Sequence, residues 1–431
     1  MNEVIMSDRM DFRLEWCHND ASDRQAGKAL WALAINDQLA TELEDLSTEA
    51  VRTRVVAPME LLGEWLAHNW WRLRWEPEQL HSNHDWRMSH SLPAIGGGMA
   101  WPNLSFSSDG DYIQCRCVPT ERSNDSGMPV RYLSRFEETI TAGEFERSID
   151  CFMERLSKRL RSSKYRQDVV ALWQEVNAER RDPVAFIWRR LEALLGYDVD
   201  AGPEILLSSL IERFDSLGKE AVNEVAAVGR SNTLAVLETL EAMAASGAHG
   251  ERPPDERKIR DCISNIPRNQ PIWRRAAMAA DMARRQWGLG SGPISDSQLL
   301  ELFALPKQVL EDSSIEGVEQ PVAMRTEQGL KIVLNRKRVT GKRFALARVL
   351  ADELYAPLED KLLPVTDSKT ARQRFQRAFA QEFLCPFSSL EEALGERHVN
   401  EEFIEDMAEH YRVSPQTVSY LLQNRGVWHA A

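Results

Sequence analysis

The chain has 431 residues and a formal net charge of −13, and its 43% hydrophobic and 28% charged residues are typical of folded globular proteins. No stretch approaches the roughly 18 consecutive apolar residues that a membrane helix requires, and the N-terminal stretch MNEVIMSDRMDFRLE has no signal-peptide core. We therefore expect a cytoplasmic protein without membrane contact, whose six cysteines are reduced thiols. The negative charge also means that any nucleic-acid binding depends on a local basic patch.

Residues 1–145 are predicted to form a small mixed α/β domain rich in tryptophan and histidine. A helix is expected over residues 58–75, because PMELLGEWLAHNWWRLRW begins with proline and its apolar residues recur at helical spacing. Two short alternating runs, at residues 101–106 and 112–118, are joined through Asp109-Gly110 and predict a β-hairpin.

Residues 146–292 are predicted to form a helical domain. Successive segments repeat apolar residues three and four positions apart and show almost no strand pattern. Asp182-Pro183 marks a helix start, residues 246–255 predict a flexible break, and residues 288–293 predict a linker to the next domain.

Residues 293–431 are predicted to form a third domain. Two strands are expected at residues 322–325 and 330–335, followed by helices at residues 341–358 and 369–384. The end of the chain predicts two further short helices. The expected fold class is therefore α+β and predominantly α-helical.

One helix of this third domain has a spacing of chemical interest. The segment RFALARVLADELYAPL has one apolar face, and Arg348 and Asp352 lie four residues apart at its edge, while Glu353 points to the opposite side. In a zinc helix of the His-Glu-x-x-His type, two histidines at this spacing bind the metal and the glutamate acts as the base. Here those three positions are Arg348, Val349 and Asp352.

Further motifs surround this helix in a definite order. They are a strand ending Val-Leu-Asn, a basic loop, an Arg-Phe-x-Leu-Ala helix start, a helix ending Phe-Ala-x-x-Phe-Leu-x-Pro and a terminal Val-Ser-x-x-x-Val helix pair, at residues 332–335, 336–342, 343–352, 379–386 and 413–421. This order resembles the ImmA/IrrE family of zinc-dependent peptidases, found in bacterial stress responses and mobile elements. The resemblance places the family's His-Glu-Leu-Gly-His motif at residues 348–352 and its third zinc ligand, a glutamate, at Gln373.

The residues at these positions do not suit zinc. Arg348 is permanently charged, Val349 cannot accept a proton and Gln373 is a poor zinc ligand, which leaves Asp352 alone. We therefore expect no metal, no cofactor and no peptidase activity. We expect an Arg348–Asp352 pair in the vacated site with Gln373 within hydrogen-bonding reach, because a buried arginine needs a partner. The alternative is an ordinary exposed helix pair.

A basic segment at residues 331–350 contains no acidic residue and interrupts the acidic background. It is a candidate contact patch for nucleic acid or an acidic partner, with a solvated loop as the simpler interpretation. The patch comprises Arg336, Lys337, Arg338, Lys342 and Arg343.

With the C-terminal helix pair, this patch supports an alternative function, a DNA-binding transcription regulator. Ser414 suits the N-cap of the second helix, and the pair has helix-turn-helix length. That second helix carries no lysine or arginine before Arg425, however, whereas a DNA-reading helix normally brings cations to the phosphates.

The N-terminal region raises a second alternative, an enzyme with its active site there. His81, His84, Asp85 and His90 lie close in sequence, although their spacing alone predicts no metal site and polar loop residues are the simpler interpretation. Tryptophans crowd the same region, where core packing is their commoner use and an interface or ligand pocket is the alternative. They are Trp65, Trp70, Trp71, Trp75, Trp86 and Trp101.

The leading hypothesis is a catalytically inactive ImmA/IrrE-like pseudo-peptidase whose former substrate cleft binds a protein partner. The resemblance implies a regulatory or sensor role in bacterial stress response, toxin–antitoxin control or antiphage defence. We expect the partner to be a protein, with genes of the same operon as the first candidates. Nucleic acid is the less favoured partner.

Overall fold

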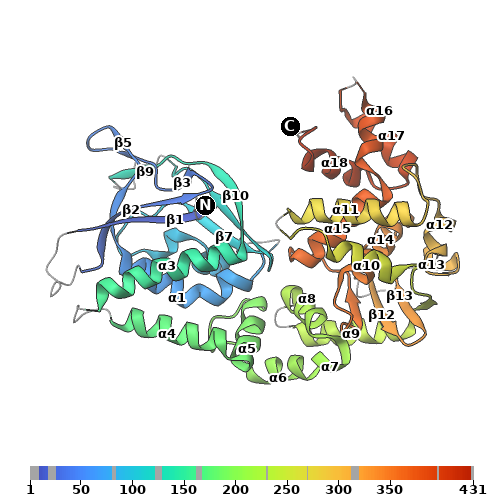
Figure 1. Cartoon of the computed structure of the whole chain (residues 1–431), viewed down its shortest axis with the longest axis horizontal. Helices are drawn as coiled ribbons and strands as arrows, with labels where there is room; N and C mark the ends of the chain where they lie inside the picture. The colour runs from blue at the N-terminus through green and yellow to red at the C-terminus, as the bar shows by residue number, and fades with distance from the viewer. Residues whose placement is uncertain are drawn as a thin grey trace, which may run out of the picture. The chain divides into compact units, whose positions relative to one another are not determined.

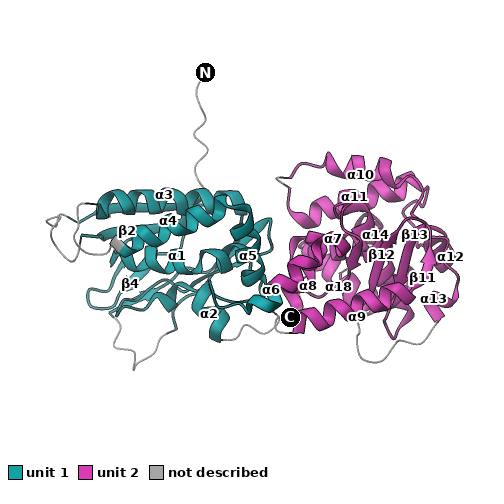
Figure 2. Cartoon of the chain, turned by 90° about the horizontal axis from the view of Figure 1, so that it is seen from below, with its two compact units in different colours: residues 1–207 teal, residues 208–431 magenta. Residues whose placement is uncertain are grey.

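The computed structural model describes residues 9–17, 26–79, 84–121, 129–161, 167–229, 232–268, 270–311, 320–395 and 398–428. The chain divides into two compact units, unit 1 (residues 1–207) and unit 2 (residues 208–431), which Figure 2 colours separately. Helices predominate, with three small sheets in unit 1 and one sheet in unit 2 among the described residues, which confirms the predicted fold class. Within the described ranges, no helix is both long enough and apolar enough to cross a membrane.

Unit 1 contains three small antiparallel sheets. Their strands are β1 (Met10–Trp16), β2 (Lys28–Ile35), β3 (Gln38–Leu39), β4 (Leu43–Asp45), β5 (Ala50–Arg52), β6 (Val55–Pro58), β7 (Leu104–Ser108), β8 (Tyr112–Cys117), β9 (Val130–Tyr132) and β10 (Phe136–Thr141). In the first sheet β2 pairs with β1, β3 and β6; the others have the orders β10-β8-β7 and β5-β4-β9. The predicted hairpin is confirmed as β7 and β8, which pair from Leu104↔Cys117 to Ser108↔Ile113.

The helices of unit 1 are α1 (Met59–Trp75), α2 (His84–His90), the 3₁₀ helix η1 (Leu92–Ile95), α3 (Ala142–Leu160), α4 (Gln167–Arg181) and α5 (Pro183–Leu194). The boundary between the two units falls within α6 (Glu204–Glu212). The predicted helix at residues 58–75 is confirmed as α1, which packs against α3, α4 and α5 (Figure 1). Thr141 and Glu144 form a capping box that starts α3, and the Asp182 side chain caps α5.

Tryptophans fill the core of unit 1. Trp65, Trp70, Trp71, Trp86 and Trp101 are all buried, which agrees with core packing as the commoner use of this residue. Of the six tryptophans singled out in the sequence, Trp75 at the end of α1 is half-buried.

Unit 2 is built on helices around one sheet of order β11-β13-β12-β14. Its elements are α7 (Phe214–Leu217), α8 (Lys219–Gly229), α9 (Thr233–Ser246), β11 (Ala248–Gly250), α10 (Glu256–Ser264), α11 (Ile272–Gln286), α12 (Asp296–Glu301), α13 (Gln308–Glu311), β12 (Val322–Thr326), β13 (Gly329–Val333), α14 (Val339–Tyr355), β14 (Leu362–Pro364), α15 (Ala371–Leu384), α16 (Phe387–Leu394), α17 (Glu401–Tyr411) and α18 (Pro415–Asn424).

The core of unit 2 forms where α15 packs against both α11 and α14. Phe375, Phe379 and Phe383 lie four residues apart on α15 and stack in succession, with ring centroids 6.2 and 5.4 Å apart. The predicted strand pair is confirmed as β12 and β13, and the predicted helices as α14 and α15.

The two units differ from the three predicted regions. Helices α3 to α5 pack on α1 within unit 1, whereas α8 to α11 belong to unit 2, so the helical region at residues 146–292 is divided between them. The segment at residues 246–255, predicted to be a flexible break, contains β11, which pairs with β13 through Ala248↔Ile332. This pairing is long-range and left no local pattern in the sequence.

Candidate functional site

The packed helices α14 and α15 bring together the four residues singled out in the sequence as candidate site positions. Thr370 caps the start of α15, accepting a hydrogen bond from the Gln373 backbone N–H at 3.3 Å. Arg348, Val349 and Asp352 lie on the buried part of α14, and Gln373 is fully buried on α15. The four predicted positions therefore share one buried region of unit 2.

Arg348 is 3% exposed and bonds to neutral acceptors only. Its Nη2 donates to the Thr366 carbonyl and to Gln373 Oε1, each at 2.6 Å. Gln373 is held by two further bonds, from the Thr366 N–H at 2.9 Å and to the Pro364 carbonyl at 3.0 Å. The expected contact between Gln373 and Arg348 is confirmed, and Val349 packs in the core.

Asp352 bonds to Arg372, and the Arg348–Asp352 pair expected from the sequence is wrong. Arg372 Nε and Nη2 donate to the two oxygens of Asp352 at 2.7 and 2.8 Å, and its Nη1 donates to Asp360 Oδ2 at 2.5 Å. Spacing along one helix permits a pair but does not select it. The planar guanidinium of Arg372, on α15, donates two parallel hydrogen bonds to the Asp352 carboxylate, and this bidentate geometry is stronger than a single hydrogen bond.

All three members of this network are buried. Burial opposes the charge on Arg372, but Asp352 and Asp360 raise its pKa above the ordinary arginine value, so the guanidinium stays protonated. We call Arg372, Asp352 and Asp360 the ion network. It joins α14, α15 and the segment before β14.

Glu224 on α8 adjoins the ion network. Its Oε2 accepts a hydrogen bond from Thr370 Oγ1 at 2.6 Å, and the residue is buried. Burial raises the pKa of Glu224 to about 7, and the nearby Asp352 carboxylate acts in the same direction, while Arg372 opposes the shift. Glu224 therefore titrates near neutral pH inside the fold.

A second buried pair links α14 to the sheet. Arg325 on β12 donates from Nε to Glu353 Oε2 at 2.6 Å and from Nη2 to the Glu353 carbonyl at 3.0 Å. Glu353 thus has a partner separate from the ion network, although it follows Asp352 in sequence. Burial raises the pKa of the Glu353 carboxyl, and Arg325 opposes that shift.

The residues present do not fit a zinc ion. Both oxygens of Asp352 accept from Arg372, and the other family positions hold a guanidinium, an aliphatic side chain and a carboxamide. No group of three or more histidine, cysteine, aspartate or glutamate residues suited to a metal occurs in the part of the chain that the structure describes. Arg372 therefore occupies both oxygens of the one carboxylate among these four positions and joins α14 to α15.

The basic segment is only partly a surface patch. Lys342 and Arg343 are buried: Lys342 Nζ donates to the Leu310 carbonyl at 2.9 Å, and Arg343 bonds to Asp296 and to the Ile294 carbonyl. Their assignment to a contact patch is therefore corrected, because helix α14 turns both side chains inward. Arg336 is half-buried, and Lys337 and Arg338 are exposed.

The C-terminal helices pack as part of unit 2. Ser414 caps α18 by accepting from the Thr417 N–H at 3.2 Å, as predicted. Val418, Leu421 and Leu422 enter the core. At the end of α18, Arg425 pairs with Glu382 at 3.1 Å, so this cation is engaged within the protein.

The N-terminal histidines have separate structural surroundings. His90 is buried between the Phe106 carbonyl and Glu76, each 2.9 Å from one ring nitrogen. His84 is exposed at the start of α2, and Asp85 pairs with Arg72 at 3.2 Å. His81 lies outside the described residues.

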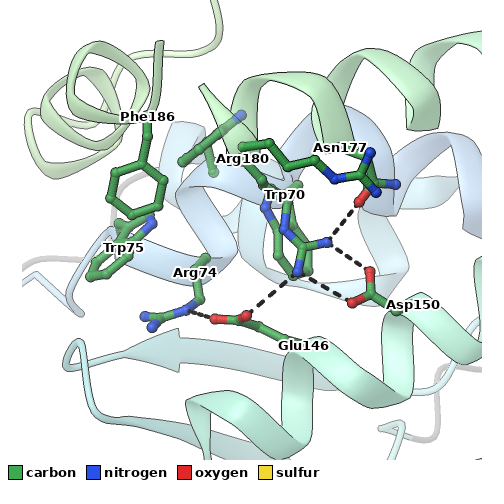
Figure 3. Close-up of a pocket in the computed structure, with 10 residues that line it drawn as sticks. Trp70, Arg74, Trp75, Glu146, Asp150, Asn177, Arg180 and Phe186 are labelled. Carbon is green, nitrogen blue, oxygen red and sulfur yellow. Dashed lines mark hydrogen bonds and ion pairs between the residues drawn. The ribbon is translucent and has the colours of Figure 1, made fainter. Parts of the chain in front are cut away.

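A cavity of about 350 Å³ opens beside α1 in unit 1, and Figure 3 shows its lining. The Arg180 guanidinium lies 4.4 Å from the centre of the Trp70 ring and bonds to both oxygens of Asp150 at 2.7 and 3.2 Å. Arg74 pairs with Glu146 at 2.5 Å. The side chain of Arg180 thus covers the face of the Trp70 ring, and Arg180 and Arg74 neutralise Asp150 and Glu146. The chain's own arginines therefore occupy the positions in which this cavity could bind a cation.

A second cavity, of about 560 Å³, lies in unit 2 between α11, α15, α16 and α18. Its buried wall includes Arg284, whose Nε and Nη2 donate to the Gly290 and Gly292 carbonyls at 2.8 and 2.5 Å. Arg425 lies 4.8 Å from the centre of the Phe387 ring. This volume is within the range of ligand and side-chain pockets.

Sequence reasoning missed Arg372, Asp360 and Glu224. Arg372 directly precedes Gln373, but nothing local distinguishes it from the other arginines of α15. Glu224 is on a distant helix, and Asp360 follows α14 in a turn. The sequence does show charged residues among the apolar residues of α8, α14 and α15. That pattern does not indicate which charged side chains pair with each other.

Comparisons of the chain with protein-family models, with curated proteins and with solved structures find no match. The site therefore defines an α+β unit whose packed helix pair encloses a buried arginine–carboxylate network.

The first prediction concerns the ion network. Replacing Arg372→Met should lower the free energy of unfolding of the full chain by about 3–5 kcal/mol, because two buried carboxylates lose their counter-ion. Chemical denaturation measures this. The control Arg285→Met breaks an exposed pair with Asp281 and should change stability by less than about 1 kcal/mol. Equal effects of the two variants would contradict the assignment.

The second prediction concerns pH. The raised pKa of Glu224 means that its contribution to stability is complete below its unfolded pKa and is lost as the pH rises through about 7. Glu224→Gln, which keeps an acceptor for Thr370, should therefore gain about 1–3 kcal/mol over the wild type at about pH 8 and little at about pH 5. Denaturation curves at both values test this. A difference independent of pH would refute it.

Proposed function

We propose that unit 2 is an ImmA/IrrE-like domain without catalytic activity, and that the chain is a cytoplasmic, protein-binding regulatory or sensor component. The bacterial settings that the resemblance implies are stress response, toxin–antitoxin control and antiphage defence. One observation carries the loss of activity: Arg372 holds both oxygens of Asp352, at the position where the family would hold zinc.

The ion network supplies what a structural metal would otherwise provide. A positive centre between carboxylates holds α14, α15 and the segment before β14 in fixed relation, and hydrogen bonds satisfy the buried charges. Because the cation is a side chain, this link needs no ion from solution. The helix pair is therefore retained as a scaffold while the chemistry is lost.

A protein-binding role is supported by the surface around the unit 2 cavity. Trp273 and Met278 on α11 are each 36% exposed, and Arg425 lies 5.0 Å from the centre of the Trp273 ring. Exposed tryptophan, methionine and arginine together are characteristic of protein interfaces. We call Trp273, Met278 and the cavity the α11 surface.

Charge indicates the chemistry of the partner. Asp281 and Glu382 are already paired with Arg285 and Arg425. Arg284 bonds only to carbonyl oxygens, and Arg274 has no ion pair among the described residues. The α11 surface therefore suits a protein segment with an apolar anchor next to a carboxylate.

The third prediction tests the metal-free assignment. The purified full chain should contain no stoichiometric zinc after dialysis against zinc, because its donor set is too poor. Installing the family motif with Arg348→His, Val349→Glu, Asp352→His and Gln373→Glu should give about one zinc per chain, since it supplies two histidines one turn apart on α14 and a glutamate on the packed helix α15. Elemental analysis measures both.

A matched control omits only Arg348→His from the rebuilt set and should lose the zinc. Stoichiometric zinc in the wild type would overturn the inactive assignment. A rebuilt variant that keeps its helical circular dichroism but binds no zinc would count against the ImmA/IrrE resemblance.

The fourth prediction concerns the partner. Candidate proteins encoded near this chain should bind it, and Met278→Glu should weaken binding at least about tenfold, because a charge enters the apolar anchor site. Leu358→Glu, at a side chain 60% exposed elsewhere in unit 2, is the control and should bind normally. Isothermal titration with the purified pair measures this. Binding that survives Met278→Glu would place the interface elsewhere.

A further inference from the structure

Three arginines surround the loop between β14 and α15. Arg348 donates to the Thr366 carbonyl at 2.6 Å, and Arg377 Nη2 donates to the Ser368 carbonyl at 2.9 Å. Between these two anchors lies Asp367, whose side chain is 62% exposed and whose Oδ1 is 4.0 Å from Arg336 Nη2. The loop therefore lies near three guanidinium groups, from the segment before α14, from α14 and from α15.

The charges in this cluster do not balance. The guanidinium groups of Arg336, Arg348 and Arg377 all interact with the single carboxylate of Asp367. The adjoining ion network holds two carboxylates against one guanidinium, which leaves one positive charge in excess. Arg348 has hydrogen bonds only at Nη2, and its Nε is buried without a partner. Burial, reinforced by Arg377 and Arg336, lowers the pKa of Arg348 to about 9 against the attraction of Asp367.

We propose that Arg336, Arg348 and Arg377, around the β14–α15 loop, form a binding site for the phosphoryl group of a small phosphorylated molecule. An oxyanion supplies negative charge to this cluster and accepts from arginine N–H groups that lack a partner. Planar guanidinium groups suit such recognition, because two N–H donors meet two oxygens of one phosphoryl group.

Several features favour a compact phosphoryl group over nucleic acid. Arg348 is 3% exposed and its unpartnered Nε is buried, so the extended backbone of a nucleic acid cannot lie against it. Lys342 and Arg343, which would extend the basic surface along a strand of nucleic acid, are buried in other contacts. Asp367 stands at the exposed side and competes with the ligand for Arg336.

The fifth prediction uses inorganic phosphate as the probe on the full chain. Calorimetric titration at constant ionic strength, with chloride as the reference anion, should show saturable phosphate binding. Arg336→Gln should weaken the binding about tenfold, because one charged donor is removed. Asp367→Asn should tighten it, because a competing acid is removed. The exposed Arg285→Gln should bind as the wild type does.

Both Arg336 and Asp367 are partly exposed, so their variants test the site without disturbing the core. An adenine nucleotide that binds more tightly than phosphate identifies an organic phosphate as the ligand, and equal affinity identifies free phosphate; either supports the proposal. It is overturned if chloride produces the same heat and thermal shift, or if the two variants leave phosphate binding unchanged. Salt-sensitive duplex DNA binding that phosphate does not compete would also overturn it.

Discussion

The bond between Arg372 and two buried carboxylates is the constraint on which the centre of unit 2 depends. Asp352 belongs to α14, Asp360 precedes β14 and Arg372 begins α15, so one guanidinium joins three consecutive elements. Burying any one of these three ions alone would cost free energy, because its charge would have no partner. Removing one of the three therefore lowers the stability of the fold. Glu224 and Thr370 extend the same constraint to α8.

The same network is the reason for proposing that unit 2 has no hydrolytic chemistry. A metal site needs ligands with free lone pairs and an open position, whereas here the carboxylate oxygens are already acceptors for a fixed cation. Among the described residues, Arg348 lies one turn before Asp352 on α14 and bonds only to a carbonyl and a carboxamide. The unbalanced positive charge around Asp367 is a consequence of that arrangement and is the basis for the proposed phosphoryl site.

Much of the local structure was predictable because it has a local cause. The periodicity of α1, α14 and α15, the β7–β8 hairpin and the Ser414 cap each follow from residues within a few positions of one another. The contact of Gln373 with Arg348 was also anticipated. The partner of Asp352 was not, because an arginine four residues away on the same helix and one on a neighbouring helix are equally compatible with the spacing.

The sequence by itself determined the helical and strand segments and the chemical identity of the side chains at the four candidate site positions, because both depend on adjacent residues. Only the tertiary structure decided which arginine bonds to Asp352, that Lys342 and Arg343 are buried, and that the helical middle region is divided between two units. The physical reason is that burial and ion pairing depend on which distant segments pack together. Such packing sums many weak contacts that no short stretch of sequence contains.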